Sequence, residues 1–188
     1  MGLITLVVIA VVIVYTVMTY NSLVSIKHNI AKAWANIDVV LKQRNEELPK
    51  LIDTCKAYMK HEAQVLENVT RARIGVDEAL QRHDVKGLSN AETALVTSLG
   101  GLYAVAENYP DLKANQTFVN LHHRITGLEN QIADRREFYN DTVNINNVRI
   151  QQFPDLIVAK LFSFTSAEML KFSTEELKDI DVSARFNA

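Results

Sequence analysis

The chain has 188 residues, a formal net charge of −2 and no charged side chain among its first 20 residues. Its six glycines and three prolines are too few for the frequent turns of a β-sandwich, a Rossmann sheet or a disordered linker. A single cysteine, Cys55, excludes an internal disulfide and any zinc or iron–sulfur site built from several cysteines. We therefore expect an all-α chain in which one helical domain follows the apolar start.

Residues 3–20 form an uncharged run of 18 residues that predicts a transmembrane helix. At ~1.5 Å per residue the run is about 27 Å long, close to the ~30 Å of bilayer hydrocarbon. We favour an uncleaved anchor, residues 1–20, over a signal peptide, because no basic side chain precedes the run and no small-residue cleavage site follows it. A buried core helix is the other alternative, but the unbroken apolar circumference favours lipid.

Two lysines set the expected orientation of this anchor. Lys27 and Lys32 follow the run closely and precede the first acidic residue, Asp38. Basic flanks stay on the cytoplasmic side of a membrane. The pattern predicts a single-pass protein with its N-terminus outside and its helical domain, residues 21–154, in the cytoplasm.

A heptad pattern of apolar residues runs from Leu23 to Val76 and predicts a helix packed lengthwise against other helices. Pro49 lies inside the pattern, where proline removes a hydrogen bond and clashes with the preceding turn. One long kinked helix and two helices joined near residues 45–48 both fit. We favour the kinked helix because the pattern keeps its phase across Pro49 and no glycine lies nearby.

A second amphipathic helix is predicted at residues 91–106, after a turn region marked by Gly75 and residues 82–87. Pro110 ends this helix. The Gly100-Gly101 pair in its middle lowers helix propensity, which a close contact with another helix could offset.

A third long helix is predicted at residues 116–151, with Asn115 as its N-cap and Pro154 as its stop. The tail, residues 155–188, opens with an apolar segment, residues 156–164, and continues as a polar stretch. The expected architecture is thus an anchor, a bundle of long antiparallel helices and a tail.

Four charged residues are singled out by the sequence as a structural polar cluster in or near the apolar seams: Asp38, Arg44, Glu62 and Arg135. A buried charge without a partner costs on the order of several kcal/mol, so these residues should pair or lie at a solvated edge. Asp38 is the predicted partner of Arg135 or Arg44. We interpret the cluster as a device that fixes helix register, in preference to a ligand site.

The chain offers no pattern typical of catalysis. No histidine follows a carboxylate by three residues, as a di-iron bundle site requires, and His61-Glu62 lacks the second histidine of a zinc-protease helix. The adjacent His122 and His123 point about 100° apart on a helix and are expected to be solvated. Cys55 lies on the apolar seam, where a free cysteine behaves as a small hydrophobe.

Binding of nucleotides or nucleic acid is not indicated either. The chain has no glycine-rich phosphate loop, and none of its segments is basic enough to attract a phosphate backbone. We expect no catalytic residue, no cofactor, no metal, no nucleic-acid partner and no small-molecule substrate.

Several separated motifs follow one another in a characteristic order: Tyr20-Asn21-Ser22-Leu23-Val24, Ala33-Trp34, Ile37-Asp38-Val39, Leu41-Lys42, Arg44, Leu48-Pro49-Lys50-Leu51, Tyr58, Lys60-His61-Glu62, Tyr109-Pro110-Asp111-Leu112-Lys113-Ala114-Asn115, Glu129-Asn130-Gln131-Ile132-Ala133, Arg135, Phe138-Tyr139-Asn140-Asp141 and Phe153-Pro154.

In this order the motifs resemble the LemA family of bacterial membrane proteins, and the resemblance covers residues 1 to 164. Lys50 and Cys55 stand where the family leads us to expect asparagine and an aliphatic residue. The resemblance implies a single N-terminal anchor, an antiparallel four-helix-bundle-like domain, location in the bacterial cytoplasmic (inner) membrane, and no established enzymatic activity.

We therefore expect a non-enzymatic scaffold or adaptor that presents a helical surface to itself or to other membrane proteins. Two alternatives stay open. The protein could bind or remodel lipid with residues 156–164 along the bilayer, or it could be a membrane-bound enzyme or a subunit of one.

The apolar segment 156–164 has seven apolar residues in nine and should be covered. We expect a homo-oligomer, because membrane anchoring concentrates copies in one plane. Its predicted contacts include Leu161, Phe162 and Phe164. Docking of the segment on its own bundle is an equal alternative.

Overall fold

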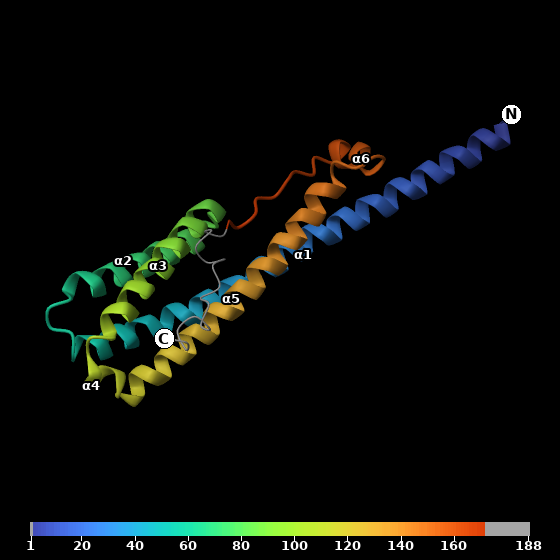
Figure 1. The fold of residues 1–188 in the computed structure, drawn as a ribbon. Helices are drawn as coiled ribbons and strands as arrows, with labels where there is room; N and C mark the ends of the chain where they lie inside the picture. Colours follow the sequence, from blue (N-terminus) through green and yellow to red (C-terminus); the bar gives the residue numbers. More distant parts are fainter. Residues whose placement is uncertain (1, 172–188) are drawn as a thin grey trace, which may run out of the picture. The chain divides into compact units, whose positions relative to one another are not determined.

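The computed structural model describes residues 2–171, and every regular element among them is a helix. Figure 1 shows them in chain order: α1 (Gly2–Lys56), α2 (Ala63–Arg82), α3 (Val85–Ala106), α4 (Pro110–Lys113), α5 (Gln116–Arg149) and α6 (Asp155–Leu161). The predicted all-α fold is confirmed. The described residues form two compact units, which we call the first unit (residues 2–44 and 126–169) and the second unit (residues 45–125 and 170–171).

Helix α1 continues without a break through Pro49, so the prediction of one helix there is confirmed. The pattern that was expected to run on to Val76 is interrupted, because the chain turns at residues 57–62. In this turn the carbonyl of Cys55 accepts the backbone N–H groups of Tyr58 and Met59 at 3.0 and 2.8 Å. In a continuing helix the Cys55 carbonyl would accept only the N–H of residue 59. Here it accepts two N–H groups, as is common where a helix ends.

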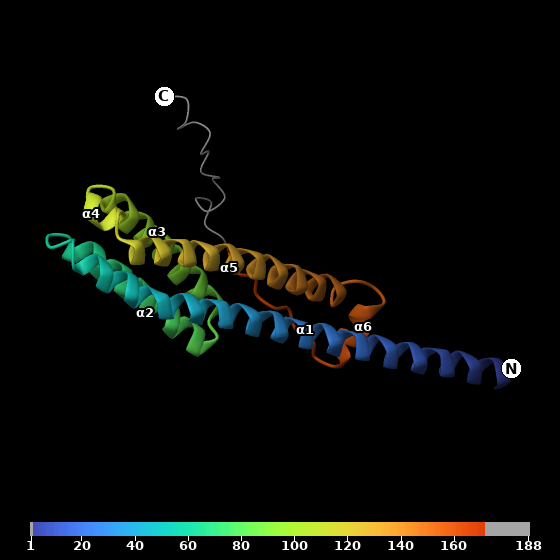
Figure 2. The ribbon, with the colours of Figure 1, turned by 90° about the horizontal axis from the view of Figure 1, so that it is seen from below.

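In the first unit, α1 and α5 run antiparallel, side by side (Figures 1 and 2). Arg149 Nη2 donates to the Ser22 hydroxyl at 3.3 Å, and the rings of Trp34 and Tyr139 lie 5.7 Å apart with an edge-on geometry. The start of α1 projects beyond this pair with its apolar side chains exposed on all sides. A helix that is apolar around its whole circumference is suited to lipid.

In the second unit, α2 and α3 form a hairpin with a two-residue link. His83 adopts a left-handed conformation (φ 52°) that ends α2, and the Asp84 carboxylate accepts the Gly87 N–H at 2.8 Å to cap α3. Gly75, which was predicted to mark a turn, lies inside α2, where a Cβ atom would be 3.7 Å from Ala91 Cβ. The close helix contact is therefore at Gly75.

The contact expected at the Gly100-Gly101 pair does not form within the described residues, because a Cβ at either position would meet nothing within 4 Å. The core of the second unit is instead made of large aliphatic side chains from α1, α2, α3, α4 and α5. Among its fully buried members are Leu48, Leu51, Val69, Val76, Leu95, Leu99, Leu102, Leu112 and Ile125.

The predicted N-cap of α5 is confirmed. Asn115 Oδ1 accepts the backbone N–H groups of Thr117 and Phe118 at 2.9 and 3.1 Å, while its Nδ2 donates to the Tyr58 hydroxyl at 2.9 Å. One side chain thus begins α5 and holds the turn at the end of α1.

Replacing Asn115 by alanine should destabilise the second unit by about 1 kcal/mol, the usual cost of a lost N-cap. Thermal unfolding followed by circular dichroism measures this. Asn115→Asp is the matched control, since a carboxylate keeps the cap and loses only the donor to Tyr58. If Asn115→Asp proves as costly as Asn115→Ala, the cap is not the source of the effect.

Candidate functional site

A small apolar core joins α6 to α1 in the first unit. Leu23 of α1, Ile150 after α5, and Val158 and Ala159 of α6 are buried together, and Phe164 packs against them. Leu23 directly follows the uncharged run, so this core fixes α6 beside the end of the candidate membrane span.

A polar network lies against the same stretch of α1. The Tyr15 hydroxyl donates to Asp155 Oδ1 at 2.7 Å, and Arg149 Nε donates to Asp155 Oδ2 at 2.7 Å. Arg149 also reaches Ser22. Because Tyr15 belongs to the apolar run, the carboxylate lies level with the C-terminal part of that run, where a charge needs a partner. The sequence analysis missed this network.

Aromatic rings pack beside this apolar core and polar network, and we call the three together the membrane-proximal module. The Tyr20 ring lies 4.7 Å from that of Phe162 and 5.8 Å from that of Phe164, measured between centroids. Two of the three predicted oligomer contacts therefore pack on α1 of their own chain, while Leu161 is exposed. A contact of Leu161, Phe162 or Phe164 with a second copy stays a prediction.

A groove of about 540 Å³ opens beside these rings. One wall is α1 from Tyr20 to Ile30, and the other is the segment of residues 162–167. This second wall is held by α5: Asn146 Nδ2 donates to the carbonyl of Thr165, and Asn147 exchanges two 2.9 Å hydrogen bonds with the backbone of Ala167. Hydrogen bonds within the chain therefore hold both walls of the groove in place without a ligand.

A second groove of about 420 Å³ separates α1 from α5 in the first unit. Two basic side chains, Lys32 and Arg135, line it, and none of its eight lining residues in the described chain is acidic. Phe138 and Ile145 form the rim on α5, and each is 52% exposed. Seven residues apart, these two large apolar side chains lie on one face of α5.

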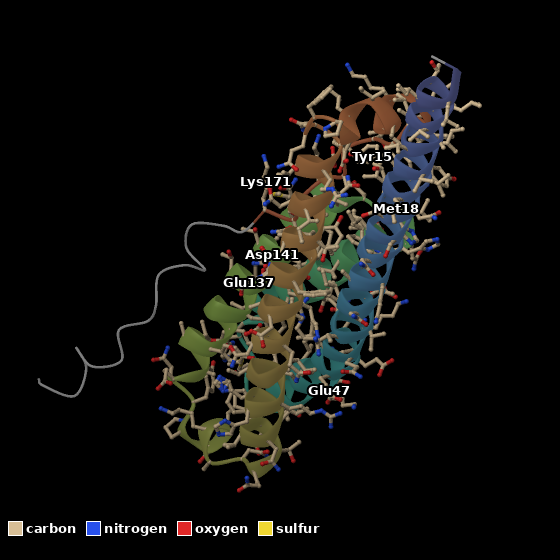
Figure 3. The ribbon with its side chains drawn as sticks, turned by 90° about the vertical axis from the view of Figure 1, so that its right-hand side faces the viewer. Tyr15, Met18, Glu47, Glu137, Asp141 and Lys171 are labelled. Atoms are coloured by element: carbon tan, nitrogen blue, oxygen red, sulfur yellow. The ribbon has the colours of Figure 1, made fainter. Side chains whose placement is uncertain are left out.

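The opposite flank of this rim is acidic. With 3.6 residues per turn, Arg135 and Thr142 lie on one side of Phe138, whereas Glu137 and Asp141 lie on the other. Figure 3 labels both acidic residues on α5, on the side away from α1. Within the described part of the first unit, neither forms an ion pair. We call Phe138 and Ile145 the ridge. The ridge is apolar and lies between the basic groove and the acidic flank of Glu137 and Asp141.

The predicted polar cluster is distributed differently from our expectation. Asp38 accepts a hydrogen bond from Lys42 one turn away, at 2.7 Å. Arg135 is exposed on the groove, whereas its neighbour Arg136 is buried. Arg44 is buried in α1 with 1% of its surface exposed. A structural role for this group of residues stays a prediction.

Glu62 belongs to the second unit, in the turn before α2, rather than to the long helix that the seam predicted. Its carboxylate accepts the backbone N–H of His61 at 3.1 Å. A hydrogen bond to Glu62 raises the pKa of the Tyr109 phenol, and the charge of Glu62 adds to the effect. Through its bond to His61, Glu62 stabilises the turn of residues 57–62.

The buried carboxylate with two cations is Glu47, which the sequence analysis overlooked. Its side chain is 5% exposed, and its Oε1 atom lies 3.1 Å from Lys50 Nζ and 3.2 Å from Arg124 Nη2. Glu47 is labelled on α1 in Figure 3. The interaction connects α1 with α5 inside the second unit.

The two histidines of α5 differ in their surroundings. His122 is half-buried, with its ring 4.3 Å from that of Tyr103, so the prediction that it is solvated was wrong. Burial lowers the pKa of His122, and the neighbouring His123, which is exposed, lowers it further.

Burial raises the pKa of the Cys55 thiol to about 11, which keeps the thiol protonated and unreactive.

Over residues 2–171, no three histidine, cysteine or acidic side chains are grouped so that they could hold a metal ion. One helix, α1, contains a segment long and apolar enough to cross a membrane, and 6% of that segment is buried.

Comparison with known proteins finds a family match. The model of the LemA family matches residues 33–184. Protein LemA of Metamycoplasma hominis is 27% identical to the chain, over 87% of the chain and 74% of that protein.

Two other relatives are magnetosome proteins. Magnetosome protein MamQ 2 of Paramagnetospirillum magneticum is 24% identical, and magnetosome protein MamQ of Magnetospirillum gryphiswaldense is 21% identical. Each match covers 80% of the chain. The chain spans 64% of the length of these magnetosome relatives.

Proposed function

Since the chain belongs to the LemA family, we propose that it is a membrane-anchored, non-catalytic scaffold that self-associates through α5. The observation that carries this proposal is the exposed ridge of Phe138 and Ile145 between flanks of opposite charge. A scaffold needs a surface that binds and no reacting groups. Lys42 with Asp38, Arg149 with Asp155 and Arg124 with Glu47 form ion pairs, each inside one unit, and Lys32 and Arg135 line an open surface.

The anchor is the exposed apolar start of α1, with the N-terminus outside and the rest of the chain in the cytoplasm of a bacterium. Lys27, His28 and Lys32 follow the span on its inner side, as the distribution of basic residues at membranes requires. Anchoring holds all copies in one orientation, so their α5 helices are parallel to one another.

A two-fold axis along the membrane normal is the simplest symmetry for such copies. Two facing α5 helices then place Phe138 and Ile145 against their own equivalents, as a heptad spacing permits. The same rotation brings the acidic flank of each copy to the basic groove of the other, at the same height. Glu137 and Asp141 would thereby meet Lys32 and Arg135 on both sides of the ridge.

The first test is the mass of the full chain in detergent, measured by light scattering. Wild type should give twice the 21.2 kDa of one chain, after correction for detergent. Phe138→Asp/Ile145→Asp should give one chain, because two buried carboxylates would face each other on the axis. Val39→Asp, at an exposed apolar position of α1 outside the ridge, is the matched control and should leave the dimer intact.

The charge arrangement gives an independent test of the same surface. Glu137→Lys/Asp141→Lys and Lys32→Glu/Arg135→Glu should each weaken the dimer, because like charges meet across it. The combined fourfold variant should restore it. A monomeric wild type at all concentrations, or a fourfold variant no better than its parents, would contradict the proposal.

A second candidate function is direct binding or remodelling of lipid by α6. Phe153, Ile157 and Leu161 are all more than half exposed, level with the inner end of the candidate span. Such side chains can enter the boundary between headgroups and acyl chains. Fluorescence of a tryptophan placed at Leu161 (Leu161→Trp) in a Trp34→Phe background should shift to the blue in vesicles if α6 enters the bilayer. Other membrane proteins as partners are compatible with either candidate.

A further inference from the structure

The groove between α1 and residues 162–167 differs in chemistry from the ridge. Among the twelve residues that line it in the described chain, Lys27 and His28 are basic and none is acidic. Hydroxyl groups of Ser163, Thr165 and Ser166 lie on the opposite wall. A pocket with cationic and hydroxyl donors and no carboxylate suits an anion with several oxygen atoms.

The position of the groove identifies the source of that anion. Tyr20 and Phe162 form its apolar end, beside the inner end of the candidate span. Lys27 follows Tyr20 by seven residues, or about 10 Å along the helix. The polar headgroup layer begins where the hydrocarbon ends and is ~5–8 Å thick on each side. The Lys27 side chain can extend toward this layer along the apolar wall.

The groove is also rigid enough to select a ligand. Asn146 and Asn147 hold the backbone of the second wall, and the Tyr139 hydroxyl donates to the carbonyl of Glu168 just beyond it. Glu168 is the acidic residue that follows this wall, and it lies near Tyr139, whose pKa is raised by burial and by the charge of Glu168. Glu168 does not line the groove, so the basic side chains of Lys27 and His28 set the charge of its α1 wall.

We propose that this groove binds the phosphodiester headgroup of an anionic phospholipid of the inner leaflet. Lys27 and His28 neutralise the phosphate, the hydroxyls of residues 163–166 bind its oxygens or the polar headgroup, and Tyr20 and Phe162 contact the glycerol and the start of the acyl chains. The anionic cytoplasmic leaflet supplies such lipids next to the groove. The inference rests on the proposed membrane placement of residues 3–20.

The test is native mass spectrometry of the full chain in detergent, titrated with phosphatidylglycerol or phosphatidylcholine. Wild type should retain one phosphatidylglycerol per chain and should prefer it to phosphatidylcholine by about tenfold or more, as charge-assisted contacts predict. Lys27→Gln/His28→Gln should remove this preference. Lys160→Gln is the matched control, because this exposed lysine of α6 lines neither this groove nor the proposed dimer surface.

Equal retention of the two lipids by wild type would overturn the proposal, and so would an equal loss in Lys160→Gln, which would indicate general attraction to charge. Displacement of the lipid by inorganic phosphate at similar concentration would assign the groove to a small anion instead. Unchanged helicity and an unchanged dimer mass in Lys27→Gln/His28→Gln separate loss of the ligand from misfolding. Because the measurement is made per chain, it is independent of whether the chain dimerises.

Discussion

Replacing Lys50 and Arg124 together by methionine is expected to destabilise the second unit by roughly 3 kcal/mol, the low end of the cost of a stranded buried charge. The reason is that Glu47 is 5% exposed and loses both of its cations. The two cations are themselves well exposed, so each single variant should cost less than 1 kcal/mol.

The single thiol of the chain reports this change directly. Cys55 is fully buried in the second unit and should react with a thiol reagent only when that unit opens. A loss of roughly 3 kcal/mol corresponds to an increase in labelling rate of about a hundredfold. Adding Glu47→Gln to the double variant should reverse most of the increase, since the stranded charge is removed.

Lys42→Met/Lys56→Met is the matched control, because these lysines pair with acids that retain contact with water. It should change the labelling rate little. If labelling in Lys50→Met/Arg124→Met equals that of the control, Glu47 does not depend on its two cations.

The second large effect is expected where α6 meets α1. Arg149→Met removes the cation from Asp155, whose side chain is 13% exposed and bonded to Tyr15 of the apolar run. The loss should weaken the docking of α6 by about 1.5–3 kcal/mol, the range for hydrogen bonds to charged groups. Tyr15 alone cannot neutralise the carboxylate.

Hydrogen exchange of the α6 amides in lipid nanodiscs measures this docking. Exchange of residues 156–161 should accelerate by about ten- to a hundredfold in Arg149→Met. Arg149→Met/Asp155→Asn should recover most of the protection, because an amide has no charge to bury. Unaltered exchange in Arg149→Met would mean that the apolar core of Leu23, Val158 and Ala159 holds α6 by itself.

The sequence predicted the helices better than the turns. The phase of the apolar pattern across Pro49 correctly indicated one helix, but the same phase continued through Tyr58 and Glu62, where the chain turns. A heptad pattern records which residues are buried and does not distinguish one helix from two that pack on the same core. The turn is made by backbone hydrogen bonds and by Asn115, which is 57 residues from Tyr58.

The charged positions show a second limit of sequence reasoning. Arg135 and Arg136 are adjacent, and the helix buries Arg136, four residues after Ile132, where a strict heptad register placed Arg135, three residues after it. Glu47 had a usable signal, since it lies four residues before Leu51 and three after Arg44 on the buried face of α1. The adjacent Glu46 is exposed, so in the sequence the two neighbouring acids, Glu46 and Glu47, resembled part of a solvated helix face.

The membrane-proximal module could not be predicted, because its contacts join distant parts of the chain. Tyr15 and Asp155 are separated by 140 residues, and neither has a pattern that indicates the other. The sequence identified the apolar segment 156–164 and left its covering open between the bundle, the bilayer and a second copy. Contacts of Phe162 and Phe164 with Tyr20 now provide part of that covering.

Disulfide crosslinking in native membranes tests self-association through α5 most directly. In a Cys55→Ala background, Phe138→Cys places one thiol on the proposed two-fold axis, and Val39→Cys places one on an exposed position of α1 outside the ridge. Mild oxidation should convert most of the Phe138→Cys variant to a covalent dimer and leave the Val39→Cys variant monomeric. Equal crosslinking at both positions, or none at position 138, would contradict the proposed scaffold.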